Sequence, residues 1–180
     1  RWLGDPDFVT MPLERLLSKS YAASLRGQID RARATPTPTS GLSSDAGTHT
    51  THYSIVDAAG NAVAVTTTIN SGFGSAVTVT GAGFLLNNEM DDFASAPGRP
   101  NQFGLVQSEV NAIAPGKRML SAMTPTIVLD RQGQLELVLG TPGGPTIITT
   151  VAQVLLGVVD QGMSLADAVT AARIHHQALP

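Results

Sequence analysis

The middle of the chain alternates apolar and polar residues, as β-strands with one buried face do. The run "YSIVDAAGNAVAVTTTI" predicts a strand, a tight turn at Ala59-Gly60-Asn61 and a returning strand. The run "TPTIVLDRQGQLELVLGTPGG" predicts a second unit of this kind, with its turn at Gln132-Gly133. Two strand hairpins are therefore expected, the second leading into a glycine pair.

Helical spacing of apolar residues occurs nearer the two ends. Residues 11–33 carry leucine, tyrosine and isoleucine three or four positions apart, which predicts an amphipathic helix. Residues 145–160 and 164–173 are also predicted to be helical, the second beginning with Ser164 as N-cap and Asp167 three residues on. Strand hairpins flanked by helices indicate a layered α/β (α+β) sandwich.

Residues 34–49, "ATPTPTSGLSSDAGTH", differ in character from both of their neighbours. They are mostly Pro, Thr, Ser and Gly, with Leu42 as the one large apolar residue, which predicts a flexible connector. Such a connector would leave the start of the next strand accessible to attack or cleavage. Because the chain begins at Arg1 without a signal-peptide pattern and stops at "HHQALP", we expect it to be a piece of a longer protein.

Composition narrows the possible functions. The 180 residues are 42% hydrophobic and 14% charged, which predicts a globular body with a core. A net charge of −3 and only two lysines argue against a nucleic-acid partner and a polybasic membrane patch, and no apolar run approaches a membrane span. The lack of cysteine excludes disulfides, thiolate metal sites and a cysteine nucleophile.

Several common motifs are absent. The chain has no G-x-S-x-G elbow, "GAGFLL" lacks the third glycine of a dinucleotide fingerprint, and "EMDD" lacks the length and glycine of a calcium loop. His175 and His176 are adjacent and would diverge by roughly 100° on a helix, so a packing or surface role is expected for them.

Two stretches remain as candidate chemistry. Thr50-Thr51-His52 follows the connector, and Thr68 and Asn70 close the next strand, so antiparallel pairing would bring Thr68 beside Thr50. Gly143 and Gly144 stand at a strand-to-helix junction, where two backbone N–H groups could face a developing oxyanion. Each also has a plainer interpretation, as a polar strand start and as an ordinary turn.

The motifs taken together resemble a known family. The runs "TTHYSIVDAAGNAVAVTTTIN", "LLNNEMDDF", "KRMLSAMTPTI", "GTPGGPTIITTV" and "ARIHHQALP" are similar, in order and spacing, to the small subunit of γ-glutamyltranspeptidases, and "WLGDPDFV" to the end of their large subunit. The resemblance covers essentially the whole chain. It implies an N-terminal-nucleophile hydrolase αββα sandwich, partial here because most of the large subunit is missing. It also implies that residues 1–49 end the large subunit with a linker and that residues 50–180 belong to the small, catalytic subunit.

The resemblance assigns roles to the candidate catalytic residues. The precursor would be cut between His49 and Thr50, freeing Thr50 as a nucleophile whose α-amine, with a pKa near 7.7–8.0, suits a general base. Thr68 would orient and activate Thr50, and Gly143 and Gly144 would form the oxyanion hole.

The resemblance also assigns substrate-binding residues. Asn70, Glu89 and Asp92 would bind the substrate α-amino group and its surroundings, although the composition of "NNEMDD" alone favours a solvated acidic loop. Ser121 would hold the α-carboxylate, and Phe103 would lie in the lid over the site.

Three departures from the family pattern bear on function. Ala122 replaces the second carboxylate-binding serine, a loss of roughly 1.5–3 kcal/mol, and Phe103 stands where many bacterial members have tyrosine. The family's arginine that grips the α-carboxylate lies in the large subunit, so this fragment alone is not expected to be a competent enzyme.

The activity implied is that of a γ-glutamyltransferase and hydrolase acting on glutathione-like substrates, with water, an amino acid or a peptide as acceptor. A related acylase of cephalosporin or oxamate type and a non-catalytic, unprocessed paralogue are the alternatives. The implied partners are the substrate, the acceptor and the large subunit of the same precursor, with no cofactor, metal or nucleic acid. The family resemblance also implies a periplasmic or secreted location.

Overall fold

The structure is a computed structural model that describes residues 2–34 and 49–176, and these residues form two compact units. Residues 2–34 and 90–120 belong to the first unit, and residues 49–89 and 121–176 belong to the second. Each unit is therefore built from segments that are separated in the sequence. Most of the predicted connector, residues 35–48, lies outside the described residues.

The first hairpin of the second unit follows the sequence prediction. Strand β1 (Thr50–Val56) pairs antiparallel with β2 (Ala62–Thr68), in a register that sets Thr50 opposite Thr68. The Asp57 carboxylate closes the turn by accepting hydrogen bonds from the side chain and backbone of Asn61 and from the backbone of Ala59. The hydrogen bonds from Asn61 also hold the pKa of Asp57 below its usual value.

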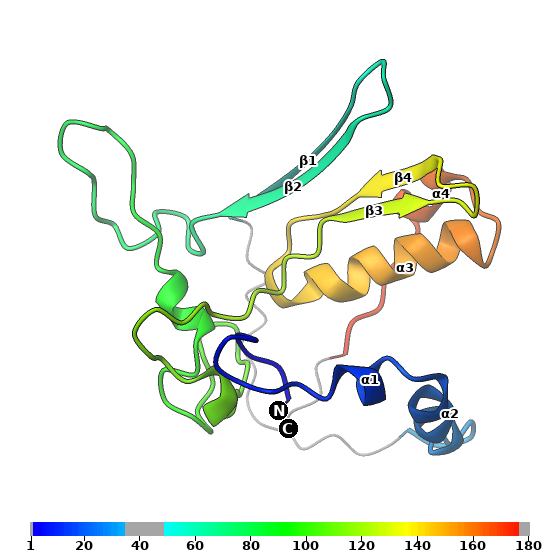
Figure 1. Cartoon of the computed structure of the whole chain (residues 1–180), viewed down its shortest axis with the longest axis horizontal. Coiled ribbons are helices and arrows are strands. Elements are labelled where there is room, and N and C mark those ends of the chain that lie inside the picture. Colours follow the sequence, from blue (N-terminus) through cyan, green and yellow to red (C-terminus); the bar gives the residue numbers. More distant parts are fainter. Residues whose placement is uncertain (1, 35–48, 177–180) are drawn as a thin grey trace. The chain divides into compact units, whose positions relative to one another are not determined.

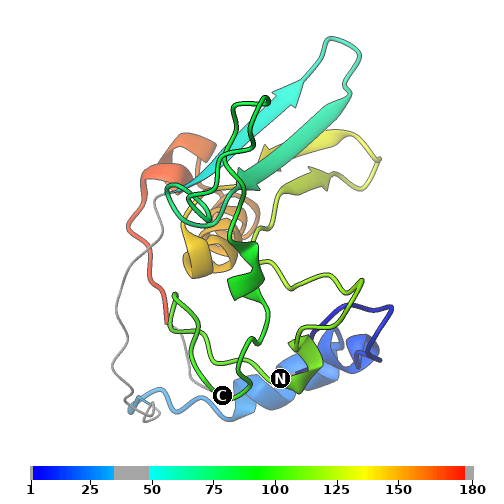
Figure 2. The same ribbon diagram turned by 90° about the vertical axis from the view of Figure 1, so that its left-hand side faces the viewer.

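The second hairpin, β3 (Thr126–Leu129) with β4 (Leu135–Leu139), is also antiparallel, and its turn falls at the predicted position. Asp130 closes it by accepting from the backbone N–H groups of Gln132 and Gln134, each at 2.8 Å. The hairpins remain separate two-stranded sheets, but β4 packs against both β1 and β2 (Figure 1). Seen after a quarter turn, they still lie side by side (Figure 2).

The helices of the second unit lie close to their predicted positions. A short 3-10 turn, η3 (Gly144–Thr146), leads into α3 (Ile147–Val159), and α4 (Leu165–Thr170) follows. Ser164 caps α4 as predicted, its hydroxyl accepting from the Asp167 N–H at 3.1 Å. The predicted end at residue 173 is wrong, because Ala171 turns extended, with ψ 148°, and ends the helix.

The core of the second unit lies where α3 meets β4 and α4. Ile147 is 1% exposed, and the other buried apolar side chains of this unit come from the same three elements: Leu137, Val151, Val154 and Ala168. Figure 1 shows α3 running along the β3–β4 hairpin. A hydrophobic layer between helix and hairpin therefore supports the β3–β4 hairpin, whose last strand leads to the glycine pair.

The first unit corrects one helix prediction. Instead of one helix over residues 11–33, the structure has α1 (Leu13–Leu16) and α2 (Lys19–Gly27). Ser18 is extended, with ψ 140°, and its hydroxyl accepts from the Tyr21 N–H, so it caps a new helix and interrupts the apolar stripe. Leu17, immediately before this break, is 82% exposed.

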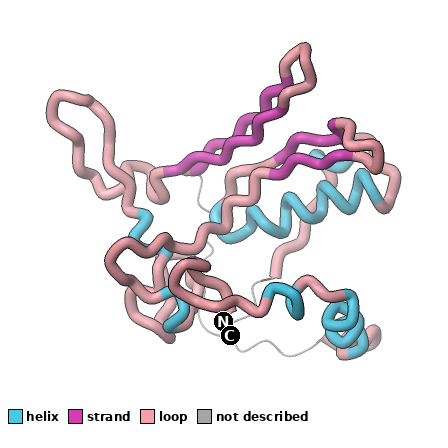
Figure 3. Tube along the Cα trace, viewed as in Figure 1, coloured by secondary structure: helices cyan, strands magenta, loops and turns pink. Residues whose placement is uncertain are grey.

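Residues 69–125 are mostly loop, with two 3-10 turns, η1 (Glu89–Asp92) and η2 (Glu109–Asn111) (Figure 3). In the first unit, Asn111 organises the loops. Asn111 is 1% exposed. Its side chain donates to the Asp92 carbonyl at 2.7 Å and accepts from the Leu120 N–H at 3.2 Å. Buried side-chain amides of this kind satisfy backbone groups that have no strand partner.

Candidate active site

Two threonine hydroxyls meet at the open end of the first hairpin. Thr50 is the first residue of β1 and Thr68 the last of β2, and the Thr50 Oγ1 donates to the Thr68 Oγ1 at 3.2 Å. The predicted juxtaposition is thus confirmed. Both residues are half-buried. An acceptor hydroxyl at hydrogen-bond distance fixes the direction in which the Thr50 hydroxyl points.

The Thr68 hydroxyl is itself held by the loop that follows it. It also accepts from the backbone N–H of Asn70 at 2.9 Å. Asn70 is 7% exposed and has a φ of 74°, a left-handed conformation that asparagine tolerates better than most residues. The chain thus reverses immediately after Thr68, and the reversal aims a donor back at it.

Asn88 joins this loop to the segment that carries Glu89. Its carbonyl accepts from the Asn70 side chain at 3.2 Å, and its side-chain oxygen accepts from the Ser71 N–H at 3.0 Å. Its amide nitrogen donates to the Ser71 hydroxyl at 2.9 Å. Glu89 follows directly and is 8% exposed, so the structure brings Asn70 and Glu89 onto neighbouring, hydrogen-bonded segments.

The glycine pair lies at the strand-to-helix junction, as predicted. Gly143 has a φ of 137° and Gly144 a φ of 54°, conformations that suit residues without a Cβ. The Gly143 carbonyl accepts from both the N–H and the hydroxyl of Thr146, at 3.1 and 2.8 Å. Because a Cβ on Gly143 would lie 2.6 Å from the Thr146 Oγ1, a larger residue does not fit without rearrangement.

His52 is a structural residue of the site that sequence reasoning left unassigned. Its ring nitrogens lie 2.8 Å from the Thr66 Oγ1 and 3.0 Å from the Ser54 Oγ. The ring also covers Gly140, where a Cβ would overlap it. Since Gly140 follows β4 and precedes Gly143 by three residues, His52 holds the glycine-rich segment against the strand that begins at Thr50. The sequence held one signal for this role, because the hairpin register places His52 opposite Thr66.

The remaining predicted residues are placed as follows. Ser121 is exposed, and its hydroxyl accepts from the Met123 N–H at 3.1 Å. The exposed His49 has its ring against Gly72, where a Cβ would lie 3.1 Å from it.

Asp92 and Phe103 belong to the first unit. The Asp92 carbonyl accepts from the Gln107 side chain at 2.9 Å. The half-buried Phe103 donates its N–H to the Asn101 side-chain oxygen at 3.0 Å.

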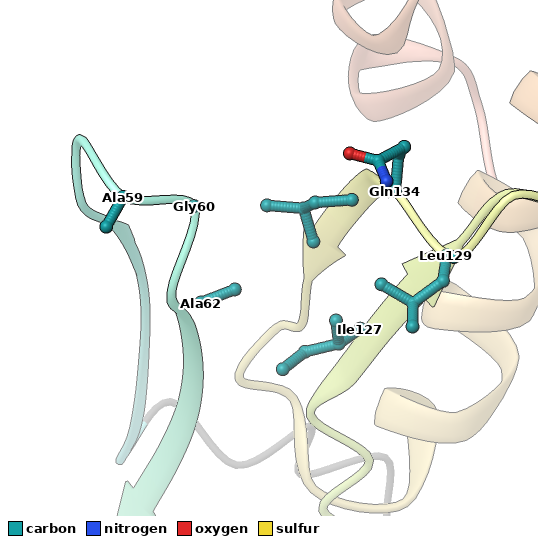
Figure 4. A pocket seen from close by; sticks show the side chains of 8 residues that line it. Ala59, Gly60, Ala62, Ile127, Leu129 and Gln134 are labelled. Carbon is teal, nitrogen blue, oxygen red and sulfur yellow. The ribbon is translucent and has the colours of Figure 1, made fainter.

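A cavity of about 480 Å³ lies in the second unit, between the β1–β2 turn and the β3–β4 hairpin (Figure 4). Residues of both hairpin turns and of β3 line it, including Gly60, Ile127 and Gln134. Ala62 lines the cavity and pairs with Val56, which is six residues along β1 from Thr50, so at roughly 3.3 Å per residue about 20 Å of strand separates the cavity from the hydroxyl pair.

Residues 2–34 and 49–176 contain no candidate metal site and no candidate membrane span. No group of three or more metal-ligating side chains occurs among them. His175 contacts the Thr149 hydroxyl at 2.9 Å, in keeping with a packing role. No helix in this described part is long and apolar enough to cross a membrane.

Comparison with known proteins places this chain in a family. The sequence profile described as gamma-glutamyltranspeptidase matches residues 1–180. The chain belongs to the γ-glutamyltranspeptidase family. A glutathione hydrolase proenzyme from Pseudomonas sp. (strain A14) is 51% identical over 99% of this chain, and one from Escherichia coli (strain K12) is 49% identical over 99%. The chain spans 31% of the length of each of these relatives.

A solved γ-glutamyltranspeptidase agrees with this placement. The Pseudomonas nitroreducens enzyme, in complex with L-DON, superposes with a TM-score of 0.67 and 61% identity, over 71% of this chain and 65% of that one. The predicted α+β, N-terminal-nucleophile hydrolase class is confirmed by this and other solved γ-glutamyltranspeptidases. An acylase proenzyme from Pseudomonas sp. (strain SE83) is also similar, 38% identical over 94% of this chain and 28% of its own length.

Proposed function

We propose that this chain supplies the nucleophile of a γ-glutamyltransferase and glutathione hydrolase, formed when a longer precursor is cut between His49 and Thr50. The observation that carries the proposal is the hydrogen bond from the Thr50 hydroxyl to the Thr68 hydroxyl, at 3.2 Å. This contact orients the one side chain that would become an N-terminal residue with a hydroxyl. The 51% identity to a glutathione hydrolase proenzyme supports the same activity.

The cut itself uses the same hydroxyl. The Thr50 Oγ1 attacks the His49 carbonyl, the C–N bond breaks, and the chain is left joined through an ester while the Thr50 amine is freed. Water then hydrolyses the ester and releases His49 as a carboxylate. Thr68 supports this step by fixing the hydroxyl, since near-attack geometry lowers such barriers by several kcal/mol.

Turnover repeats the chemistry on a substrate amide. The Thr50 amine removes the hydroxyl proton, the oxygen attacks the γ-carbonyl, and the proton passes to the leaving amine as the amide bond breaks. Water or an incoming amine then cleaves the acyl-enzyme ester. The role proposed for Gly143 and Gly144 is donation of backbone N–H groups to the oxyanion, worth about 10²–10³ in rate per donor.

Recognition of the γ-glutamyl head group is assigned to several polar residues of the chain. Asn70 and Glu89 are buried and lie on adjoining segments, where a carboxylate and an amide oxygen suit an ammonium ion. We assign Asp92 to the same ammonium, Ser121 to the α-carboxylate and Phe103 to the lid, with the large subunit supplying the arginine.

Ala122 favours a second candidate function, that of a related acylase. A methyl group cannot donate the hydrogen bond that a second serine would give to the α-carboxylate, and the similarity to an acylase proenzyme points the same way. The two candidates share the nucleophile and differ in the acyl group accepted.

Self-cleavage of the full-length precursor tests the shared mechanism. Intact-mass measurement should find a chain that begins at Thr50, and Thr50→Ala should abolish both that chain and the hydrolysis of a γ-glutamyl anilide. Thr51→Ala is the matched control, because Thr51 is exposed and faces the other side of β1. An uncut native precursor would support the non-catalytic paralogue instead.

A pair of substrates separates the two enzymatic candidates. Asp92→Ala in the full-length enzyme should raise KM sharply for a γ-glutamyl substrate and far less for a glutaryl substrate, which has no amine. Equal losses on the two would overturn the ammonium assignment. Faster native turnover of glutaryl than of γ-glutamyl substrate would favour the acylase.

A further inference from the structure

Asp5 and Arg118 form an ion pair between two segments of the first unit that are far apart in the sequence; the Asp5 carboxylate is buried, whereas the Arg118 side chain is 65% exposed. The Asp5 side chain is 1% exposed. Arg118 gives its carboxylate three hydrogen bonds: Nη2 to Oδ1 at 2.6 Å, Nε to Oδ2 at 3.0 Å and the backbone N–H to Oδ2 at 2.7 Å. The two guanidinium donors reach both oxygens of one carboxylate, a geometry that a lysine could not reproduce.

The residues on either side of Asp5 and of Arg118 also contact one another closely. A Cβ on Gly4 would lie 2.5 Å from the Val110 carbonyl oxygen, so the backbone there approaches as only glycine allows. Lys117 Nζ donates to the carbonyls of Val110 and Ala112, at 2.8 and 2.9 Å, and lies 5.8 Å from the centre of the Phe8 ring. The segment Gly4–Phe8 is thus seated on Val110–Arg118 by shape, charge and an aromatic contact.

These two segments lie on opposite sides of the His49–Thr50 bond. Asp5 precedes that bond and Arg118 follows it, although both belong to one compact unit. While the precursor is intact, the pair is an internal contact. Once the bond is cut, the same atoms belong to two chains, and no peptide link through residues 34–49 restrains their separation.

We propose that the segment Gly4–Phe8 is a docking segment of the preceding chain, and that Asp5 is its anchor in a site formed by Val110–Arg118 of the following chain. This inference rests on the proposed cleavage, and it names the partner as the other product of the same cut. Loss of Arg118 leaves the buried Asp5 carboxylate without its guanidinium, and loss of the Asp5 charge removes the group that the Arg118 donors hold, so either change chiefly speeds dissociation.

Asp7 provides a matched control. Its carboxylate also contacts Arg118 Nη2 at 2.6 Å, but its side chain is 74% exposed, so water replaces that contact at little cost. Asp5→Asn and Asp7→Asn therefore make the same chemical change at a buried and an exposed partner of one arginine. Only the first should weaken the attachment.

The experiment measures retention of the small chain by the large chain in the full-length protein. The protein carries an affinity tag on the N-terminal side, is immobilised after cleavage, and is washed with increasing urea. The release of the chain that begins at Thr50 is timed. Asp5→Asn and Arg118→Gln should speed release about tenfold or more, Arg118→Lys should give an intermediate rate, and Asp7→Asn should stay within about twofold of the native protein.

A second version makes the cut independent of Thr50. A specific protease site replaces residues 40–46 in the Thr50→Ala precursor, and the same variants are compared after external cleavage. Release from Asp5→Asn at the native rate, or equal effects of Asp5→Asn and Asp7→Asn, overturns the docking role in either version. A native precursor that fails to cut itself overturns the proposed function, and the externally cut protein still decides the docking role.

Discussion

Replacing Thr68 with valine would test how far one hydroxyl controls the nucleophile. Valine keeps the shape of threonine but offers no acceptor, so the Thr50 hydroxyl and the Asn70 N–H each lose a hydrogen bond, at 3.2 and 2.9 Å. An unsatisfied, partly buried donor costs roughly 1–3 kcal/mol. If the Thr50 hydroxyl must recover its direction in the transition state, about 1.4 kcal/mol slows the reaction tenfold and about 2.8 kcal/mol a hundredfold.

The assay follows both reactions of the full-length protein. Self-cleavage is timed by the appearance of the chain that begins at Thr50, and turnover is measured with a γ-glutamyl anilide. Thr68→Val should slow each by about 10- to 100-fold, with kcat falling more than KM rises. Thr68→Ser, which retains the acceptor, should recover most of both rates.

Thr67→Val is the control, because Thr67 is exposed on the opposite face of β2. It should change either rate by less than about twofold, as expected of a surface substitution. Native-like rates in Thr68→Val, or an equal loss in Thr67→Val, would refute the role given to the hydroxyl pair.

Three further predictions concern packing, specificity and pH. Gly140→Ala should destabilise the protein by about 1–3 kcal/mol, because a Cβ overlaps the His52 ring, and adding His52→Ala should recover much of the loss in a double-mutant cycle of urea unfolding. Ala122→Ser should improve the apparent affinity for γ-glutamyl substrates about tenfold or more if they are the native class, and an unchanged or poorer KM favours the acylase. The hydrogen bonds from Arg118 hold the pKa of Asp5 below its usual range, so the stabilisation is complete above about pH 4 and is lost as the pH falls. The urea concentrations that separate the cleaved chains of the native protein and of Asp5→Asn should therefore converge in acid, whereas a constant gap would contradict this linkage.

Short-range patterns in the sequence were sufficient for the hairpins and for one helix cap. Alternation and turn residues located both β-turns, and Ser164 with Asp167 marked the start of α4, because these features depend on residues a few positions apart. The pairing of Thr50 with Thr68 followed as well, since a tight turn fixes the register of an antiparallel hairpin. Family resemblance then attached chemistry to residues that the pattern had only brought together.

Tertiary structure decided what depends on the path of the chain over longer distances. The helix breaks at Ser18 despite the continuous apolar stripe, because the serine cap stabilises a new helix start. Leu17 is therefore exposed and not buried. His52 gained its role only when the segment after β4 came to lie against its ring. Asp5 and Arg118 are 113 residues apart, and the local sequence around either residue does not predict that the two pair. Such pairs are selected by the desolvation of a buried charge, which exists only once the surrounding segments have packed.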